Sequence, residues 1–133
     1  VMKEYWELKG VDMRGFFVID GSGLSPSGSL TAFNLCGILN AMKKDTNYQA
    51  FYEGVAIAGR HGTVRNIGKG TRAEGSMRVK SGSIDGTRAY AGYMESKSGQ
   101  LLSFSISAQK YVPGTGRDAG LELNKLLGLI ADL

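Results

Sequence analysis

Four consecutive residues, Lys80-Ser81-Gly82-Ser83, place an ammonium group, two hydroxyls and a backbone segment without a side chain next to one another. Residues 76–84 and 87–94 alternate as strands do, and Asp85-Gly86 between them is a favoured pair for a tight hairpin turn. The alternation places Lys80 on the polar side of the first strand. An ammonium, a hydroxyl and an unshielded N–H group suit a small anion such as a carboxylate. The alternative is a basic edge strand, on which lysine discourages pairing with other chains.

A second polar stretch, Asp20 to Gly28, reads DGSGLSPSG and carries three hydroxyls around one apolar residue, Leu24, which is expected to anchor the loop. Taken alone, this composition is typical of an ordinary glycine- and serine-rich loop.

The positive charge is concentrated in the middle of the chain. The net charge of the 133 residues is +4, and residues 60–88 alone hold seven basic and two acidic side chains, a net +5. A concentrated positive field favours an anionic partner, which includes nucleic acid, an acidic polymer or a carboxylate-bearing substrate. A solvated basic loop is the other interpretation. Residues 59–75 contain no aromatic side chain to stack on bases, so nucleic acid is the least favoured of these partners.

The chain has one cysteine, Cys36, and one histidine, His61. These counts exclude an internal disulfide and a histidine cluster, and we expect neither a metal nor another cofactor. Cys36 is expected to act as a small buried apolar residue. The glycines of residues 68–75 lack the spacing of a phosphate-binding loop. No apolar run reaches membrane-spanning length, and no secretory start is present.

Apolar spacing predicts helices over residues 1–9, 30–44 and 47–58, with Ser29 or Thr31 capping the second. The apolar stripe of that second helix should face the core; it comprises Leu35, Ile38, Leu39 and Met42. Residues 16–19 are expected to form a short buried extended run. No capping residue precedes the first helix, so we expect the protein to continue upstream.

A third strand is predicted over 101–109, with Leu102, Phe104, Ile106 and Ala108 on its buried face. A closing helix is predicted from Arg117 onward, because its apolar residues recur at helical spacing; they are Leu123, Leu126, Leu127 and Ile130. The sequence therefore predicts an α+β fold, in which an antiparallel three-stranded meander packs with N-terminal helices and a C-terminal helix.

Two motifs together resemble the penicillin-binding D-alanyl-D-alanine carboxypeptidases of the S13 (PBP4-like) peptidase family: DGSGLS at 20–25 and the K-[ST]-G strand at Lys80-Ser81-Gly82. The run GRHGTVRN at 59–66 is similar to the family's G-x-x-G-T-L-x-N segment, and 87–93 to its following strand. The resemblance implies that residues 1–133 are the C-terminal portion of a β-lactamase/transpeptidase-like domain.

The resemblance also implies a role for each matching residue. Lys80 would anchor the terminal carboxylate of the substrate and hold Ser25, the second-motif serine that relays a proton during acyl transfer. Ser81 would donate a hydroxyl hydrogen bond to that carboxylate, and Gly82 would permit close approach. The Ser83 N–H would form half of an oxyanion hole.

The sequence departs from the family pattern in two places. An asparagine normally follows the second-motif serine, and here Ser27 and Gly28 stand in its place, which leaves recognition of the substrate amide in question. The nucleophile of the family is the serine of an S-x-x-K motif at a helix start far upstream. The one such spacing here, Ser107 to Lys110, ends a predicted strand, and we interpret it as coincidence. The lysine triplet Lys97-Ser98-Gly99 is interpreted in the same way, because it falls between strands.

The resemblance implies part of a serine-type D-Ala-D-Ala carboxypeptidase/endopeptidase that acts on peptidoglycan stem peptides, binds β-lactams and works outside the cytoplasm. The missing N-terminal half would supply the S-x-x-K serine, so residues 1–133 alone are predicted to be inactive. A non-catalytic relative that binds peptidoglycan peptides through Lys80 and Ser81 is the alternative. A basic nucleic-acid-binding module is a third.

Overall fold

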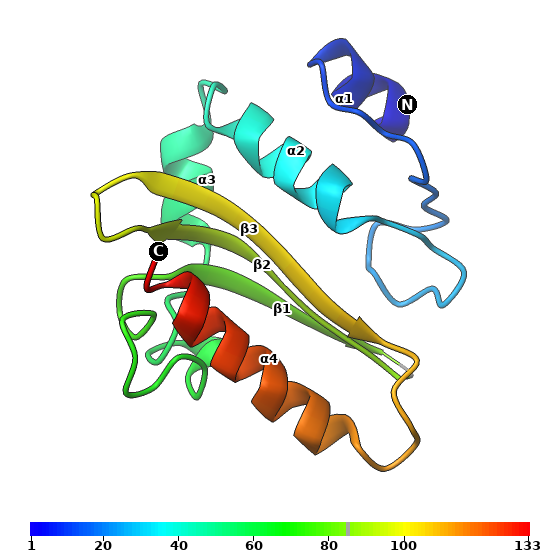
Figure 1. Ribbon diagram of the computed structural model, residues 1–133. Coiled ribbons are helices and arrows are strands. Elements are labelled where there is room, and N and C mark those ends of the chain that lie inside the picture. The colour runs from blue at the N-terminus through cyan, green and yellow to red at the C-terminus, as the bar shows by residue number, and fades with distance from the viewer. Residues whose placement is uncertain (85) are drawn as a thin grey trace.

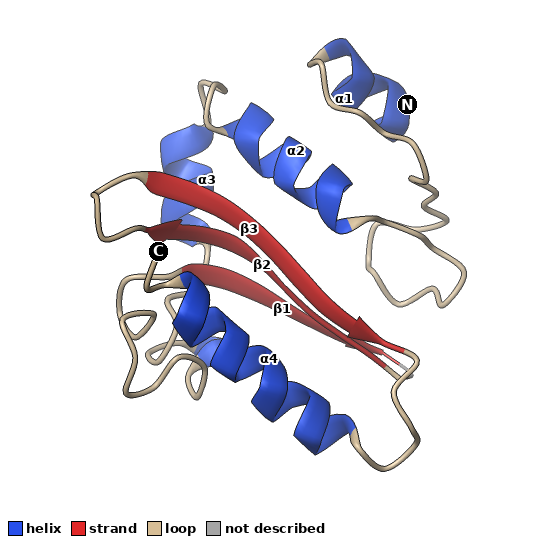
Figure 2. Ribbon diagram, viewed as in Figure 1, coloured by secondary structure: helices blue, strands red, loops and turns tan. Residues whose placement is uncertain are grey.

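A three-stranded antiparallel sheet carries helices on both faces in the computed structural model, which describes residues 1–84 and 86–133 (Figures 1 and 2). The strands β1 (Arg78–Ile84), β2 (Thr87–Glu95) and β3 (Leu101–Gln109) lie in the order β1-β2-β3. The predicted α+β meander is therefore confirmed. Ile84 pairs with Thr87, and Gly86 has a φ of +69°. Asp85 of the predicted Asp-Gly turn lies outside the described residues.

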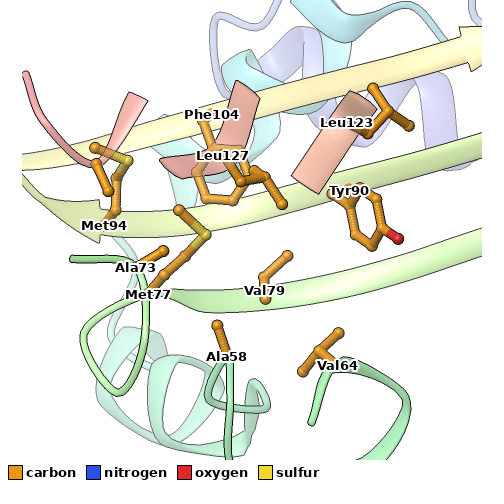
Figure 3. Close-up of a cluster of buried hydrophobic side chains, with 11 residues drawn as sticks. Ala58, Val64, Ala73, Met77, Val79, Tyr90, Met94, Phe104, Leu123 and Leu127 are labelled. Atoms are coloured by element: carbon orange, nitrogen blue, oxygen red, sulfur yellow. The ribbon is translucent and has the colours of Figure 1, made fainter. Parts of the chain in front are cut away.

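The helix α4 (Gly116–Ile130) covers one face of the sheet, and the main core lies between them (Figure 3). The buried face of β3 is the predicted one: Phe104 lies in the core, and Leu102, Ile106 and Ala108 pack against it. The predicted closing helix is present; Leu123 and Leu127 are buried, Ile130 packs against the core, and Leu126 is 46% exposed. Nothing in the described chain covers that side of α4, and Gly128 and Ala131 are buried instead. The buried cluster comprises Ala58, Val64, Ala73, Met77, Val79, Tyr90, Met94, Phe104, Leu123, Leu127 and Ala131.

The helices α2 (Ala32–Met42) and α3 (Tyr48–Gly54) lie on the opposite face, where α2 runs along β3 (Figure 1). Of the two predicted caps, Thr31 is the one used: its hydroxyl accepts from the Asn34 N–H, and the Asn34 side chain accepts from the Thr31 N–H. This reciprocal capping box satisfies two of the free donors at the start of the helix. Of the predicted apolar stripe, Leu39 is buried and the other three members are partly buried. Cys36 is also only partly buried.

The helix α3 ends at Gly54, four residues before its predicted end. Residues 55–58 are extended instead, because they pair with the start of β1: the Val79 N–H donates to the Ala56 carbonyl at 2.8 Å, and the Ala58 N–H to the Met77 carbonyl at 2.9 Å. A short 3-10 helix, η1 (Gly62–Val64), follows and lies beside β1.

The N-terminal helix α1 (Met2–Leu8) matches its predicted range within one residue at each end. The prediction of a buried run at 16–19 is wrong, since Phe17 is 57% and Ile19 59% exposed. The segment does not join the sheet; Phe17 pairs with Ser29, so the loop between them closes on itself. None of the described helices combines the length and apolarity needed to cross a bilayer.

Candidate active site

The outer edge of β1 presents free backbone hydrogen-bonding groups. The Val79 N–H points away from β2 and donates to the Ala56 carbonyl. Because every second residue of a strand points its N–H and C=O groups to the same side, those of Ser81 and Ser83 also point to the outer edge. Residues 55–58 fill this edge only near Arg78. Beyond that point, the described chain places no strand beside β1. An extended peptide could therefore pair with β1 at the Ser81 N–H and at both backbone groups of Ser83, while the Ser81 carbonyl accepts from Lys80.

Lys80 lies at the start of this free edge and is exposed. Its side chain leaves β1 on the face of α2 and α3, opposite to that of Val79, as predicted. The Lys80 Nζ donates a hydrogen bond to the Ser81 carbonyl at 2.7 Å. No carboxylate of the described residues pairs with it. The ammonium group thus lies at the strand edge with two of its three donors available to an anion.

Ser81 faces the other way and is partly buried. Its hydroxyl oxygen lies 2.7 Å from the hydroxyl oxygen of Thr63, which projects from η1. Gly82 follows, and a methyl group built on it would meet no atom of the described chain within 4 Å. An ammonium, a pair of hydroxyls and a space without side chains therefore converge on one stretch of four residues, which is what a small carboxylate ligand needs.

Ser25 lies in a loop built from local hydrogen bonds. The Asp20 carboxylate accepts from the N–H groups of Ser22 and Gly23, at 2.9 and 3.0 Å, and from the Ser22 hydroxyl. These donors, the Ser22 hydroxyl first, lower the pKa of Asp20 below its usual value. Gly23 supports the turn with a φ of +74°. The Ser25 hydroxyl accepts from the Ser27 N–H at 3.3 Å, and its own hydrogen is free to be donated.

The Ser25 loop is fixed to the rest of the chain by Asn34, which is 1% exposed. Its amide nitrogen donates to the carbonyls of Asp12 and Arg14, at 2.7 and 3.2 Å, while its oxygen caps α2. Leu24, expected to be the apolar anchor of the loop, is 76% exposed and is not an anchor in the described chain. Asn34 anchors the loop instead, because its side chain links Asp12 and Arg14, before the loop, to the start of α2, after the loop.

The structure places Lys80, Ser81, Gly82 and Ser83 together on one strand edge and Ser25 on a separate loop. No hydrogen bond within the described chain joins Ser25 to Lys80, so their direct contact stays a prediction. Neither side chain is part of the buried core.

The two motif look-alikes lack the geometry of a site. Ser107 lies within β3 and Lys110 beyond its end, whereas an S-x-x-K pair needs a helical turn to bring serine and lysine together. Lys97 lies in the turn between β2 and β3, where its ammonium is 3.6 Å from the Asp132 carboxylate.

Several of the basic residues between 60 and 88 have structural partners. The Arg78 guanidinium lies 4.6 Å from the centre of the Tyr52 ring and donates to the carbonyls of Glu53 and Val55. Arg72 donates to the Ala131 carbonyl at 3.3 Å. These contacts remove two guanidinium groups from the set that could bind a polyanion, which weakens the nucleic-acid interpretation. The described residues hold no group of three or more histidine, cysteine or acidic side chains able to bind a metal ion.

Thr63 is the site residue that the sequence did not reveal. The G-x-x-G-T run marked its neighbourhood, but the run gave no reason to place Thr63 against Ser81, eighteen residues away. Asn34 also went unrecognised, since a lone asparagine in an apolar helix gives no pattern from which burial could be inferred.

Residues 1–127 match the model of the D-Ala-D-Ala carboxypeptidase 3 (S13) family. The chain is 36% identical over 116 residues to carboxypeptidase DacB of Mycolicibacterium smegmatis, and 34% identical over 102 residues to a D-alanyl-D-alanine carboxypeptidase of Actinomadura sp.. These matches cover 83% and 73% of this chain but only 25% and 19% of the relatives. The chain thus spans about a quarter or less of the length of these curated relatives.

Solved structures share the fold at lower sequence identity. Penicillin binding protein 4 (dacB) from Haemophilus influenzae, in complex with a β-lactam, superimposes with a TM-score of 0.86 at 22% identity, over 98% of this chain and 32% of that one. The Bd0816 predatory endopeptidase from Bdellovibrio bacteriovorus, in complex with an immunity protein, gives a TM-score of 0.78 at 16% identity, over 98% of this chain and 36% of that one. The similarity supports the partial α+β domain described above.

Proposed function

Since the chain belongs to the D-Ala-D-Ala carboxypeptidase 3 (S13) family, we propose that it is part of a serine-type D-alanyl-D-alanine carboxypeptidase/endopeptidase. The enzyme acts on peptidoglycan stem peptides and is acylated by penicillin. Residues 1–133 form the C-terminal portion of its transpeptidase-like domain. The nucleophilic serine and its lysine come from an S-x-x-K segment elsewhere in the protein. The substrate lies outside the cytoplasm, so the enzyme works there too.

The observation that carries this proposal is the free edge of β1. A stem peptide pairs antiparallel with this edge, using the outward N–H and C=O groups of Ser83. Its terminal carboxylate meets the Lys80 ammonium and the Ser81 hydroxyl, which charge-assisted hydrogen bonding favours. Binding in this register brings the scissile carbonyl to the Ser83 N–H, which stabilises the developing oxyanion. Ser25 passes a proton between nucleophile and leaving group.

The test is labelling with a fluorescent penicillin. The longer protein that carries residues 1–133 and an upstream S-x-x-K motif should form a covalent adduct, and residues 1–133 alone should form none. Lys80→Ala should slow acylation by about 10²–10³-fold, a loss typical of removing one electrostatic contact to the reacting group. Lys97→Ala is the matched control, because it removes the lysine of the other K-S-G triplet and should react like the wild type. Equal loss in both variants would argue against the proposal.

The missing asparagine after Ser25 favours a second candidate, a non-catalytic relative that binds stem peptides through Lys80 and Ser81. Such a protein would lack an upstream S-x-x-K motif and form no adduct. It would still bind a peptide that ends in D-Ala-D-Ala, and Lys80→Ala would abolish that binding. Nucleic-acid binding is distinguished by retention on DNA that falls with salt. That retention would be lost on replacing Arg65 and Arg72 and unaffected by Lys80→Ala.

A further inference from the structure

Two groups reach the same strand edge from opposite faces of β1. The Lys80 ammonium comes from the face of α2 and α3 and bonds the Ser81 carbonyl. The Thr63 hydroxyl comes from the face of α4 and bonds the Ser81 hydroxyl. Ser81 is therefore the point at which both groups meet.

Thr63 is held in place by its neighbours. Val64, the next residue, is fully buried in the core, and its carbonyl accepts from the Gly59 N–H at 3.1 Å. The 55–58 segment just before it is paired with β1. Since a threonine side chain has few rotamers, a fixed backbone also fixes the hydroxyl. Thr63 is nevertheless exposed, so the pair it forms with Ser81 borders on solvent.

Which of these two hydroxyls donates to the other decides whether Ser81 can donate a hydrogen bond to an anion. A serine hydroxyl has one hydrogen to donate and two lone pairs to accept. If Ser81 gives its hydrogen to Thr63, it has none left for a ligand carboxylate. If Thr63 donates to Ser81, the Ser81 hydrogen is free, and it is polarised by the bond it accepts. An anion at the strand edge selects the second arrangement.

We propose that Thr63 is a positioning residue of the carboxylate-binding site: by donating its hydroxyl hydrogen to Ser81, it holds the Ser81 hydroxyl ready to donate to the terminal carboxylate of the ligand. The inference rests on the proposed function, because it takes the peptide carboxylate as the ligand. Thr63 does not touch the ligand; it acts through Ser81. Its effect must therefore vanish when either the carboxylate or the Ser81 hydroxyl is removed.

The experiment measures two ligands that differ only in this group, on the longer protein that carries residues 1–133. Binding is measured by calorimetry for a stem peptide ending in D-Ala-D-Ala, either as the free acid or as the C-terminal amide. Acylation rates are measured for benzylpenicillin and its methyl ester. Thr63→Val should weaken binding of the acid roughly three- to tenfold, the value of one hydrogen bond, and leave the amide unchanged. Acylation should show the same difference between acid and ester.

Three controls complete the design. Thr63→Ser keeps the hydroxyl and should restore binding of the acid. Ser81→Ala should weaken the acid roughly 10- to 100-fold, as expected for a bond to a charged group, and adding Thr63→Val to it should change nothing further. Thr46→Val removes a threonine hydroxyl that makes no hydrogen bond in the described chain, and it should behave as wild type.

The outcomes separate the two proposals. If the wild type binds the acid better than the amide but is never acylated, the proposed enzymatic function is wrong. The binding measurements with the two peptides then still test the role of Thr63. If Thr63→Val weakens acid and amide equally, or if its effect adds to that of Ser81→Ala, then Thr63 only supports η1 and the inference is wrong. If the wild type does not distinguish acid from amide, the site does not read a carboxylate, and both proposals fail.

Discussion

Tyr93 in the middle strand donates its hydroxyl hydrogen to the main-chain carbonyl of Leu39 in α2, at 2.7 Å. Tyr93 is fully buried, and its ring is surrounded by those of Tyr48, Phe51 and Tyr52 at centroid distances of 5.6 to 6.4 Å. One side chain thus joins the sheet to both helices on this face. Because α2 follows the Ser25 loop directly, Tyr93 also helps to set where that loop stands relative to the sheet.

Tyr93→Phe should lower the free energy of unfolding by about 0.5–1.5 kcal/mol, because the Leu39 carbonyl loses its 2.7 Å hydrogen bond and keeps only the longer one, at 3.3 Å, from the Lys43 N–H. Chemical denaturation monitored by circular dichroism measures this. Tyr111→Phe is the control, since the Tyr111 hydroxyl makes no hydrogen bond within the described residues. An equal loss in the two variants would contradict the role given to Tyr93.

Burial, and then the charge of nearby Tyr48, raise the pKa of Tyr93 well above its usual value. The native protein therefore keeps this proton at a pH where the unfolded chain releases it. The stabilising effect is complete below the ordinary tyrosine pKa of about 10 and is lost as the pH rises above it. The stability advantage of the wild type over Tyr93→Phe should shrink above about pH 10. An advantage that stays constant from pH 7 to 11 would contradict this.

Gly82→Ala and Gly92→Ala should have opposite effects. A methyl group on Gly92 would run into the backbone carbonyl of Arg78 on the neighbouring strand, and backbone cannot move aside as a side chain can. Gly92→Ala should lower the free energy of unfolding by at least about 1–3 kcal/mol.

Gly82→Ala meets no atom of the described chain, and it should leave the melting temperature unchanged or slightly raised. Its methyl group would stand on the same face as Lys80, the group proposed to bind the ligand carboxylate. Acylation by penicillin should fall by about tenfold or more, as small displacements in a site do. Full acylation activity in Gly82→Ala would show that Gly82 is not needed for ligand approach. Unchanged stability in Gly92→Ala would show that Gly92 is not needed for the close contact with β1.

Asn34→Ala should loosen the Ser25 loop as well as destabilise the fold. It leaves the carbonyls of Asp12 and Arg14 without their donor and removes half of the capping box, at a cost of about 2–3 kcal/mol. Hydrogen exchange should become faster across residues 12–31. Asn40→Ala on the same helix removes one exposed bond, to Ser103, and should have little effect on either measurement. Unchanged exchange in the loop of Asn34→Ala would show that Asn34 does not anchor it.

Ser25→Ala tests the second-motif assignment. The Ser25 hydroxyl has a free hydrogen, whereas Ser27 contributes only its backbone N–H to this pair. If Ser25 relays a proton, its removal should slow acylation by about 10²-fold or more, within the range for proton-transfer groups. Ser27→Ala should be nearly neutral. A larger effect at Ser27 than at Ser25 would mean that the motif has been placed on the wrong serine.

The elements that the sequence predicted are those whose pattern is local and long. The alternation from Leu101 to Gln109 extends over nine residues and defines both faces of β3. The extended segment at 55–58 could not be predicted in this way, because it is too short to show a period and forms only through its pairing with β1. The exposure of Leu126 depends on what lies beyond α4, which helical spacing does not encode.

The same difference between local patterns and long-range contacts applies to the candidate site. Lys80 to Ser83 form one continuous motif, so strand geometry alone predicts that they share an edge. The partnership of Thr63 with Ser81 is a contact between two segments, and it depends on how η1 lies against β1. Patterns along the chain carry no information about such contacts.

The segment that pairs with the start of β1 has a consequence for the length of ligand that can be accommodated. In the proposed mode of binding, an antiparallel peptide would direct its C-terminal end toward Lys80, and just past this point residues 56–58 already occupy the edge. The occupied stretch would then set the register, since such a peptide could not slide further without displacing those hydrogen bonds. A chain that ends at Lys80 would fit against the occupied stretch, whereas a longer one would have to turn away from the sheet. In the proposed mode of binding, this short piece of backbone would distinguish a peptide terminus from a peptide interior.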